Sequence, residues 1–330
     1  MKRAFDVVTL GEAMVRLSPP DFQRLEQATS LEMRVGGAEL NVAVDATRFG
    51  LRTAWLSKLP DNPLGRFTAN KAREHGVDVS HVVWMQQARM GLYFVEFGAQ
   101  PRPSSVLYDR AGSAISTLQP DDFDWPAIFS QARLFHVSGI TPALGASCAE
   151  ATLTAAKAAQ EAGCLVSVDV NYRAKLWSEA EASRVMRAVM AHTDILITTE
   201  EDTKRVYGIE AASYQEVARQ LRDRFSLQAV AITLRETPSV LRQRWSAFAL
   251  AGDAVYDAPT YEIEVVDRLG AGDSFTAGFI WGYLQGDIAK GVQYGTAFSA
   301  LKHSVPGDFH WGTLEEVEAL VKGGGPRIQR

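Results

Sequence analysis

Short apolar runs alternate with helical patterns along most of the chain, and this alternation constrains the fold more than any other feature. The apolar runs occupy residues 5–11, 52–59, 132–140, 164–172, 194–199 and 228–234. Continuous apolar runs are typical of parallel strands that are buried on both faces. Helical patterns occupy residues 38–50, 64–76, 145–162, 178–191, 200–207 and 212–224. The sequence therefore predicts an α/β fold, a doubly wound and mainly parallel sheet flanked by helices.

Two segments depart from this pattern. Residues 12–35 and 88–115 are rich in strand-forming and turn residues, with alternating pieces such as MGLYFVEF. We expect them to pair as a small separate sheet that projects from the main one. Because no linker or repeat divides the chain, residues 1–330 are predicted to form a single domain.

Composition excludes several classes of protein. The chain has 34 basic and 39 acidic residues and a formal charge of −5, which gives no basic field for a nucleic-acid backbone. The two cysteines, Cys148 and Cys164, form neither a disulfide framework nor a zinc motif. No apolar stretch approaches the length of a membrane span, and Asp6 and Glu12 interrupt any export signal. We therefore expect a cytoplasmic protein without a membrane or nucleic-acid partner.

The strongest local motif is DRLGAGDSFTAGFIWGYL at residues 267–284. A strand pattern at 261–266 runs into Gly270, Ala271, Gly272 and Asp273, and an apolar helix pattern follows. Backbone amides exposed by such a turn, together with the helix dipole, form an anion site. A carboxylate beside a bound phosphate can accept the proton of an attacking hydroxyl. The alternative is that Asp273 only caps the helix.

A second glycine motif, GGAELN, occupies residues 36–41 and also precedes a helix pattern. Gly36 and Gly37 permit a ligand to approach the backbone, and Asn41 lies in the first helical turn. Alone, a glycine pair is more often a simple turn.

Together, the two motifs resemble those of the ribokinase (PfkB-type) family of carbohydrate kinases, from Gly11 to Asp308. The resemblance implies a ribokinase-like fold in which the small sheet, roughly 12–35 and 88–115, is a lid over the sugar. It also implies that Asp273 is the catalytic base and that Gly270, Ala271 and Gly272 form the anion hole.

Further stretches, among them GLYF, YDRAGSA, SGITPAL and DVNYRAKLW, resemble the branch of this family that phosphorylates 2-keto-3-deoxygluconate. The resemblance implies a set of substrate-binding residues: Gly36, Gly37, Asn41, Tyr93, Tyr108, Arg110, Ile140, Arg173 and Asp308. A sugar acid carries a carboxylate, which a guanidinium binds well, so Arg110 and Arg173 fit this substrate class. The alternative is that both arginines face solvent or pair with Asp109 and Asp169.

The nucleotide side departs from the family pattern. The family's Asn-x-x-Glu motif, which helps to place Mg²⁺ through water, corresponds to residues 199–202, with Thr199 first and Asp202 last. The glycine-rich loop over the nucleotide corresponds to the glycine-free stretch TLRETPSV at 233–240. The late Asn near the adenine is Thr296. The resemblance implies ATP and Mg²⁺ as cofactors, with nucleotide contacts from Thr199, Thr233, Arg235, Gly270, Gly272 and Thr296 and with Asp202 holding the metal through water.

The sequence thus predicts an ATP-dependent kinase of the terminal hydroxyl of 2-keto-3-deoxygluconate, giving 2-keto-3-deoxy-6-phosphogluconate. Alternatives are a fructokinase or a kinase of a related keto-deoxy acid, or a sugar-acid-binding protein without transfer. The family resemblance also implies a homodimer through the lid.

Overall fold

The computed structural model describes residues 3–324. Its main sheet has the strand order β14-β13-β12-β11-β10-β9-β1-β4, with β15 paired to β13. The parallel strands are β1 (Phe5–Leu10), β4 (Thr53–Leu56), β9 (Ala132–Ser138), β10 (Leu165–Asp169), β11 (Ile195–Thr198) and β12 (Ala229–Ser239). The antiparallel strands are β13 (Arg242–Ala251), β14 (Ala254–Asp257) and β15 (Tyr261–Glu264). The predicted doubly wound, mainly parallel sheet is confirmed.

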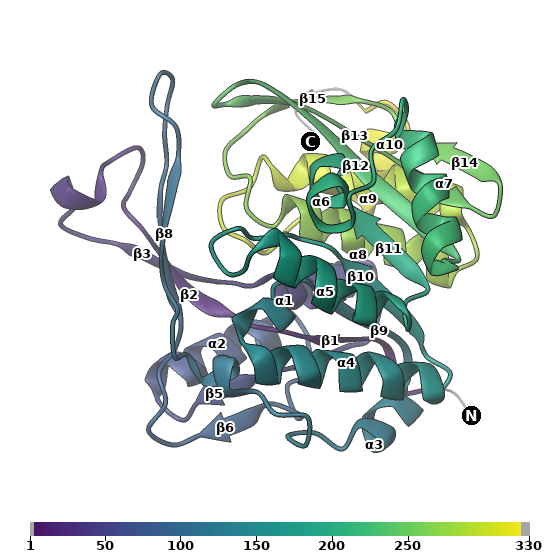
Figure 1. Ribbon diagram of the computed structural model, residues 1–330. Helices are drawn as coiled ribbons and strands as arrows, with labels where there is room; N and C mark the ends of the chain where they lie inside the picture. Colours follow the sequence, from purple (N-terminus) through teal and green to yellow (C-terminus); the bar gives the residue numbers. More distant parts are fainter. Residues whose placement is uncertain (1–2, 325–330) are drawn as a thin grey trace.

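Helices cover both faces of this sheet (Figure 1). One face packs against α3 (Trp125–Ser130), α4 (Ala146–Glu161), α5 (Glu179–Met190), α6 (Glu200–Tyr207) and α7 (Tyr214–Phe225). The other packs against α1 (Ala38–Arg48), α8 (Ala271–Leu284) and α9 (Ile288–Lys302). Successive residues of a strand point to opposite faces of the sheet. Val8 and Phe135 pack on the face covered by α3 to α7, whereas Val7 and Leu134 pack on the face covered by α1, α8 and α9. This alternation explains the continuous apolar runs of the strands.

A second sheet has the strand order β3-β2-β7-β8 and projects from the α/β body (Figure 1). It consists of β2 (Met14–Ser18), β3 (Glu32–Gly36), β7 (Leu92–Glu96) and β8 (Ser105–Asp109). These bounds fall within the two predicted segments, apart from the last residue of β3. We call this element the small sheet; its action as a lid stays a prediction.

The predicted strand at 52–59 divides in two. β4 ends at Leu56 and belongs to the main sheet, whereas β5 (Lys58–Pro60) pairs with β6 (Val83–Met85). The short helix α2 (Pro63–Glu74) follows, capped by Asn62, whose Oδ1 accepts from two helix amides. The last helix is α10 (Leu314–Val321). Within residues 3–324, no helix is long and apolar enough to cross a membrane.

The structure corrects the prediction that residues 233–240 form a loop over the nucleotide. Residues up to Ser239 continue β12, which pairs antiparallel with β13. The run lacks glycine, so the chain stays extended until the turn at Val240 and Leu241. Pro238 lies where the register shifts, between Glu236 and Ser239, a position that tolerates a missing amide donor.

Candidate active site

A cavity of about 1370 Å³ opens between the small sheet and the carboxyl ends of the parallel strands. Its walls come from β8, from the loops after β10 and β11, from β12 and from the start of α8. Predicted site residues in this lining are Tyr108, Arg110, Arg173, Thr199, Asp202, Thr233, Arg235, Gly270, Ala271, Gly272 and Asp273. Ligand sites of open α/β sheets lie at this end of the strands.

The turn before α8 requires glycine at its cap. Gly270 has φ +85°, and a Cβ there would lie 2.0 Å from the carbonyl oxygen of Asp308. Because Gly270 is the cap and α8 begins at Ala271, Asp273 is the third residue of the helix. The alternative interpretation of Asp273 as a helix cap is therefore wrong. Its carboxylate is instead held at the cavity wall, where Oδ2 accepts from Nδ2 of Asn41 at 2.6 Å.

The pKa of Asp273 is raised to about 7, chiefly by burial and to a smaller extent by the nearby carboxylates of Glu39 and Asp308. The hydrogen bond from Asn41 and the charge of Arg173 act in the opposite direction. A carboxylate with a pKa near neutrality is a stronger base than an ordinary aspartate and still ionises at physiological pH. Asp273 thus suits the transfer of a proton from an alcohol.

The first glycine motif packs beneath this carboxylate. The amide of Gly37 donates to Oδ1 of Asn41 at 3.3 Å, which orients the amide group that reaches Asp273. A Cβ at Gly36 would lie 2.3 Å from both Oδ2 of Asp308 and the hydroxyl of Tyr93. Gly36 therefore allows these two polar side chains to approach the backbone.

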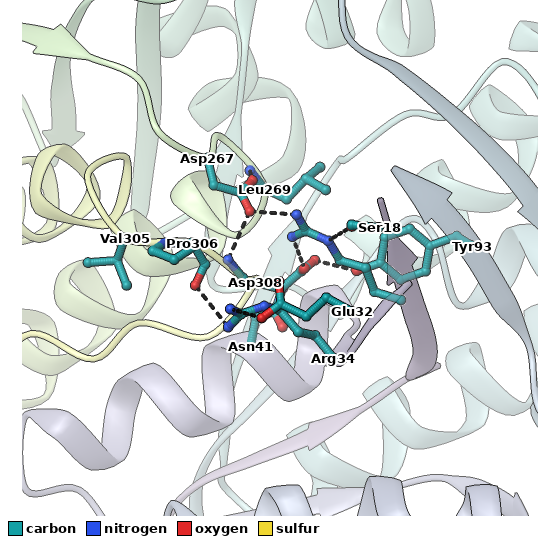
Figure 2. Close-up of polar contacts among 12 residues, drawn as sticks. Ser18, Glu32, Arg34, Asn41, Tyr93, Asp267, Leu269, Val305, Pro306 and Asp308 are labelled. Atoms are coloured by element: carbon teal, nitrogen blue, oxygen red, sulfur yellow. Dashed lines mark hydrogen bonds and ion pairs between the residues drawn. The ribbon is translucent and has the colours of Figure 1, made fainter. Parts of the chain in front are cut away.

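Tyr93 and Asp308 lie in a buried polar network rather than in the cavity lining (Figure 2). The hydroxyl of Tyr93 donates to Oδ2 of Asp308 at 2.7 Å, and Arg16 pairs with Oδ1 of Asp308 at 2.7 Å. Arg16 also pairs with Asp267 at 2.7 Å. The sequence analysis did not identify Arg16, although Arg16 alternates with Met14 and Ser18 on the same side of β2. It also assigned no role to Asp267.

The two predicted arginines, Arg110 and Arg173, differ in whether a carboxylate pairs with them. Arg110 forms an ion pair with the buried Glu12, whose other oxygen accepts from Ser113. The alternative partner Asp109 pairs with Arg89 instead. Arg173 is exposed in the cavity, donates to the carbonyl of Tyr172 and has no carboxylate within ion-pair distance in residues 3–324. Arg173 therefore offers an unpaired cation to a ligand, whereas the charge of Arg110 is largely neutralised.

Two further acids line the cavity near Arg173. Burial raises the pKa of Asp169 well above its usual range, and the charges of Asp273 and Asp202 add to this effect. Burial also raises the pKa of Asp202, against the charge of Arg173 and a hydrogen bond with Thr199. Thr199 caps α6, and its Oγ1 accepts from the amide of Asp202 at 3.1 Å. Asp169 was considered only as a partner of Arg173, although it ends a buried strand beside the predicted site.

Thr296 and Ile140 also lie outside the cavity lining, as do Gly36, Gly37 and Asn41. Thr296 is fully buried within α9 and donates to the carbonyl of Val292 at 2.7 Å, so its contact with a nucleotide stays a prediction. The helix pattern did not reveal which side of α9 would face inward. Ile140 follows β9, and its amide donates to Oγ of Ser138 at 3.2 Å; Ala143 and Leu144 line the cavity in its place.

A buried, near-neutral carboxylate beside the amino end of a helix, in a cavity with unpaired cations, is the arrangement of an enzyme that transfers a phosphoryl group to an alcohol. Residues 4–310 match the pfkB family carbohydrate kinases, and the chain belongs to this family. It is thus a carbohydrate kinase, a phosphotransferase with an alcohol group as acceptor.

Relatives over nearly the whole length support this assignment. A 2-dehydro-3-deoxygalactonokinase of Haloferax volcanii is 40% identical over 98% of this chain and 99% of its own. A 5-dehydro-2-deoxygluconokinase of Shouchella clausii is 31% identical over 97% of this chain and 96% of its own. The crystal structure of a 2-dehydro-3-deoxygluconokinase of Thermotoga maritima has a TM-score of 0.94 at 43% identity, covering 97% of this chain and 100% of that one. The predicted ribokinase-like fold is confirmed.

Proposed function

We propose that this chain transfers the γ-phosphoryl group of ATP to the terminal hydroxyl of 2-keto-3-deoxygluconate, giving 2-keto-3-deoxy-6-phosphogluconate. The observation that carries the substrate class is the unpaired guanidinium of Arg173 in the cavity that Asp273 also lines. A sugar acid brings a carboxylate for this cation, which a neutral hexose lacks. The three relatives described above are named as kinases of keto-deoxy sugar acids, which supports the same class.

The turn at residues 270–273 contains the groups that phosphoryl transfer needs. The substrate hydroxyl oxygen attacks the γ-phosphorus, the bond to the bridging oxygen breaks, and ADP leaves. Asn41 occupies Oδ2 of Asp273, so Oδ1 is left to accept the hydroxyl proton. The amides of residues 270–272 stabilise the charge on the transferred group. Closure of the small sheet over the sugar would exclude water from this step.

The donor set suits Mg²⁺ held partly through water. Asp169 and Asp202 supply the hard carboxylate oxygens that Mg²⁺ prefers, and both line the cavity. No cluster of three metal-binding side chains exists among the described residues. The metal would therefore depend on water and on the phosphates of ATP for its remaining ligands, and it would offset the charge that develops on them. Arg235 and Thr233, also in the lining, would contact the nucleotide.

The deciding experiment is an ADP-release assay with Mg-ATP over a panel of acceptors: 2-keto-3-deoxygluconate, its galactonate epimer, fructose, ribose and gluconate. We expect the highest kcat/KM with 2-keto-3-deoxygluconate. Preference for a neutral sugar would overturn the role of Arg173 while leaving that of Asp273 intact. No turnover with any acceptor would favour a binding protein without transfer.

The galactonate epimer is the second candidate, because the Haloferax volcanii relative carries that name at 40% identity. The two acids differ in the orientation of one hydroxyl, so the same assay separates them. We also propose a homodimer through the small sheet, where Met33 and Leu107 expose 44% and 60% of their surface. Light scattering should give about 72 kDa, twice the 36.1 kDa of one chain; a monomer at micromolar concentration would contradict this.

A further inference from the structure

One buried guanidinium joins the small sheet to the α/β body. Arg16 on β2 is 1% exposed. Its Nη1 donates to Asp308 and its Nη2 pairs with Asp267, each at 2.7 Å, and its Nε donates to Oγ of Ser18 at 3.1 Å. Because every nitrogen of the guanidinium has a partner, Arg16 fixes β2 relative to both acids.

Asp267 extends this contact to the turn before α8 (Figure 2). Its Oδ1 accepts from the amide of Leu269 at 3.1 Å, and its Oδ2 also accepts from the amide of Gly307 at 2.9 Å. Leu269 directly precedes Gly270, the cap of α8. A displacement of Arg16 would therefore change the hydrogen bonds that set the amides of residues 270–272.

An apolar contact runs beside the polar one. The side chain of Leu269 packs against the apolar cluster of Met14, Tyr93 and Val95, which lie on β2 and β7 of the small sheet. The residue before the cap thus touches the small sheet directly, independently of Arg16.

In the α/β body, a second buried cation, Lys302, joins the segment that contains Asp267 to the segment that contains Asp308. Nζ of Lys302 is buried and donates to the carbonyls of Asp267 and Val305 at 3.2 and 3.1 Å. The segments 267–270 and 305–308 therefore form one unit on the body. Arg34 on β3 also reaches this unit, through a hydrogen bond to the carbonyl of Pro306 at 3.3 Å, whereas Arg16 reaches it through two ion pairs.

We propose that Arg16 is a positioning residue that couples carbohydrate binding beneath the small sheet to phosphate binding at the turn 267–272. The inference rests on the proposed function, since it needs one ligand on each side of Asp273. A carbohydrate bound beneath the small sheet holds β2 and with it Arg16 in place, and Arg16 keeps Asp267 and the turn aligned. By linkage, each ligand then tightens the binding of the other by the same factor.

The test is calorimetric titration of the full chain. Mg²⁺ with the β,γ-imido analogue of ATP is titrated with and without the panel carbohydrate that proves to be phosphorylated. We expect mutual tightening of about fivefold or more in the wild type. Arg16→Lys keeps the charge, but one ammonium cannot replace the planar fork. In this variant the factor should fall below about twofold, while each ligand alone binds within about threefold of wild type.

The matched control is Arg52→Lys. Arg52 also forms a forked pair, with Nε and Nη2 each 3.0 Å from an oxygen of Asp6, but outside the cavity lining. This variant should keep the wild-type factor. A folded Arg16→Lys variant with wild-type coupling, or a wild type without coupling, overturns the proposal. If Arg16→Lys does not fold, Leu269→Ala takes its place and should weaken the coupling through the apolar contact.

The coupling and the substrate assignment fail in different ways. A wrong substrate appears as absent binding of 2-keto-3-deoxygluconate to the wild type, and the titrations then use the acceptor that the panel identifies. A wrong coupling appears as normal binding of both ligands without mutual effect.

Discussion

Nδ2 of Asn41 donates to Oδ2 of Asp273 at 2.6 Å and so joins the first turn of α1 to the first turn of α8. The two residues come from the two glycine motifs, which lie 232 positions apart. The hydrogen bond orients the carboxylate and leaves its other oxygen for a substrate proton. The motifs are therefore two halves of one site.

Replacing Asp273, the proposed base, tests this directly. Asp273→Asn keeps the shape and the contact with Asn41 but cannot accept a proton. We expect kcat to fall by about 10²–10⁴-fold, the usual contribution of a general base. Binding of the ATP analogue, measured by calorimetry, should change little. Turnover within tenfold of wild type would remove Asp273 from this role.

The pH dependence of kcat should report the same carboxylate. Because burial raises the pKa of Asp273 to about 7, the base is protonated in acid, and kcat should rise about tenfold per pH unit below 7 and then level off. The residual activity of Asp273→Asn serves as the control and should not show this step. A wild-type profile that is flat from pH 5 to 8 would contradict the assignment.

The same raised pKa affects stability. The folded state binds the Asp273 proton more tightly than the unfolded state, so the penalty of burying the charge grows between the unfolded pKa and about 7. At pH 8 the penalty is complete, and at pH 5 it is partial. Asp273→Asn removes it, and at about 1.4 kcal/mol per unit its advantage over wild type should be about 3 kcal/mol larger at pH 8 than at pH 5. Urea unfolding of both chains at the two pH values measures this difference.

Removal of the unpaired guanidinium should affect the sugar acid selectively. We expect Arg173→Met to raise the KM for 2-keto-3-deoxygluconate at least tenfold, because a charge-assisted contact with its carboxylate is lost. The KM for ATP should change less. Lys175→Met, a neighbouring cation of the same cavity lining, is the matched control. An unchanged KM in Arg173→Met would place the carboxylate elsewhere.

The two glycines of the turn should respond differently to an added methyl group. In Gly270→Ala the Cβ would meet the carbonyl oxygen of Asp308 at 2.0 Å, and φ is +85°, so we expect a loss of several kcal/mol or failure to fold. In Gly272→Ala no atom lies within 4 Å of the Cβ, so the melting temperature should stay within a few degrees of wild type. Equal thermal stability of the two variants would contradict the described turn.

The helices, the strands and the turn at Gly270 were predictable because local patterns carry them. Buried strands and amphipathic helices have distinct periods, and the cap at Gly270 needs a glycine wherever the chain folds. The strand conformation of residues 233–239 was not predictable. An extended run without turn residues continues a strand only when a partner such as β13 lies beside it, and the partner is set by the tertiary structure. The burial of Thr296 was not predictable either, because it depends on which side of α9 packs against the rest of the protein.

By itself, the sequence determined the order of strands and helices, the small sheet and the residues of the turn at Asp273, since each follows from local period or from one residue's conformational freedom. Only the tertiary structure decided the partners of the charged groups. Arg16 meets Asp267 and Asp308, and Glu12 takes Arg110 while Arg173 stays unpaired. Such pairings join residues hundreds of positions apart, and burial and distance, which no local pattern encodes, decide which charges meet.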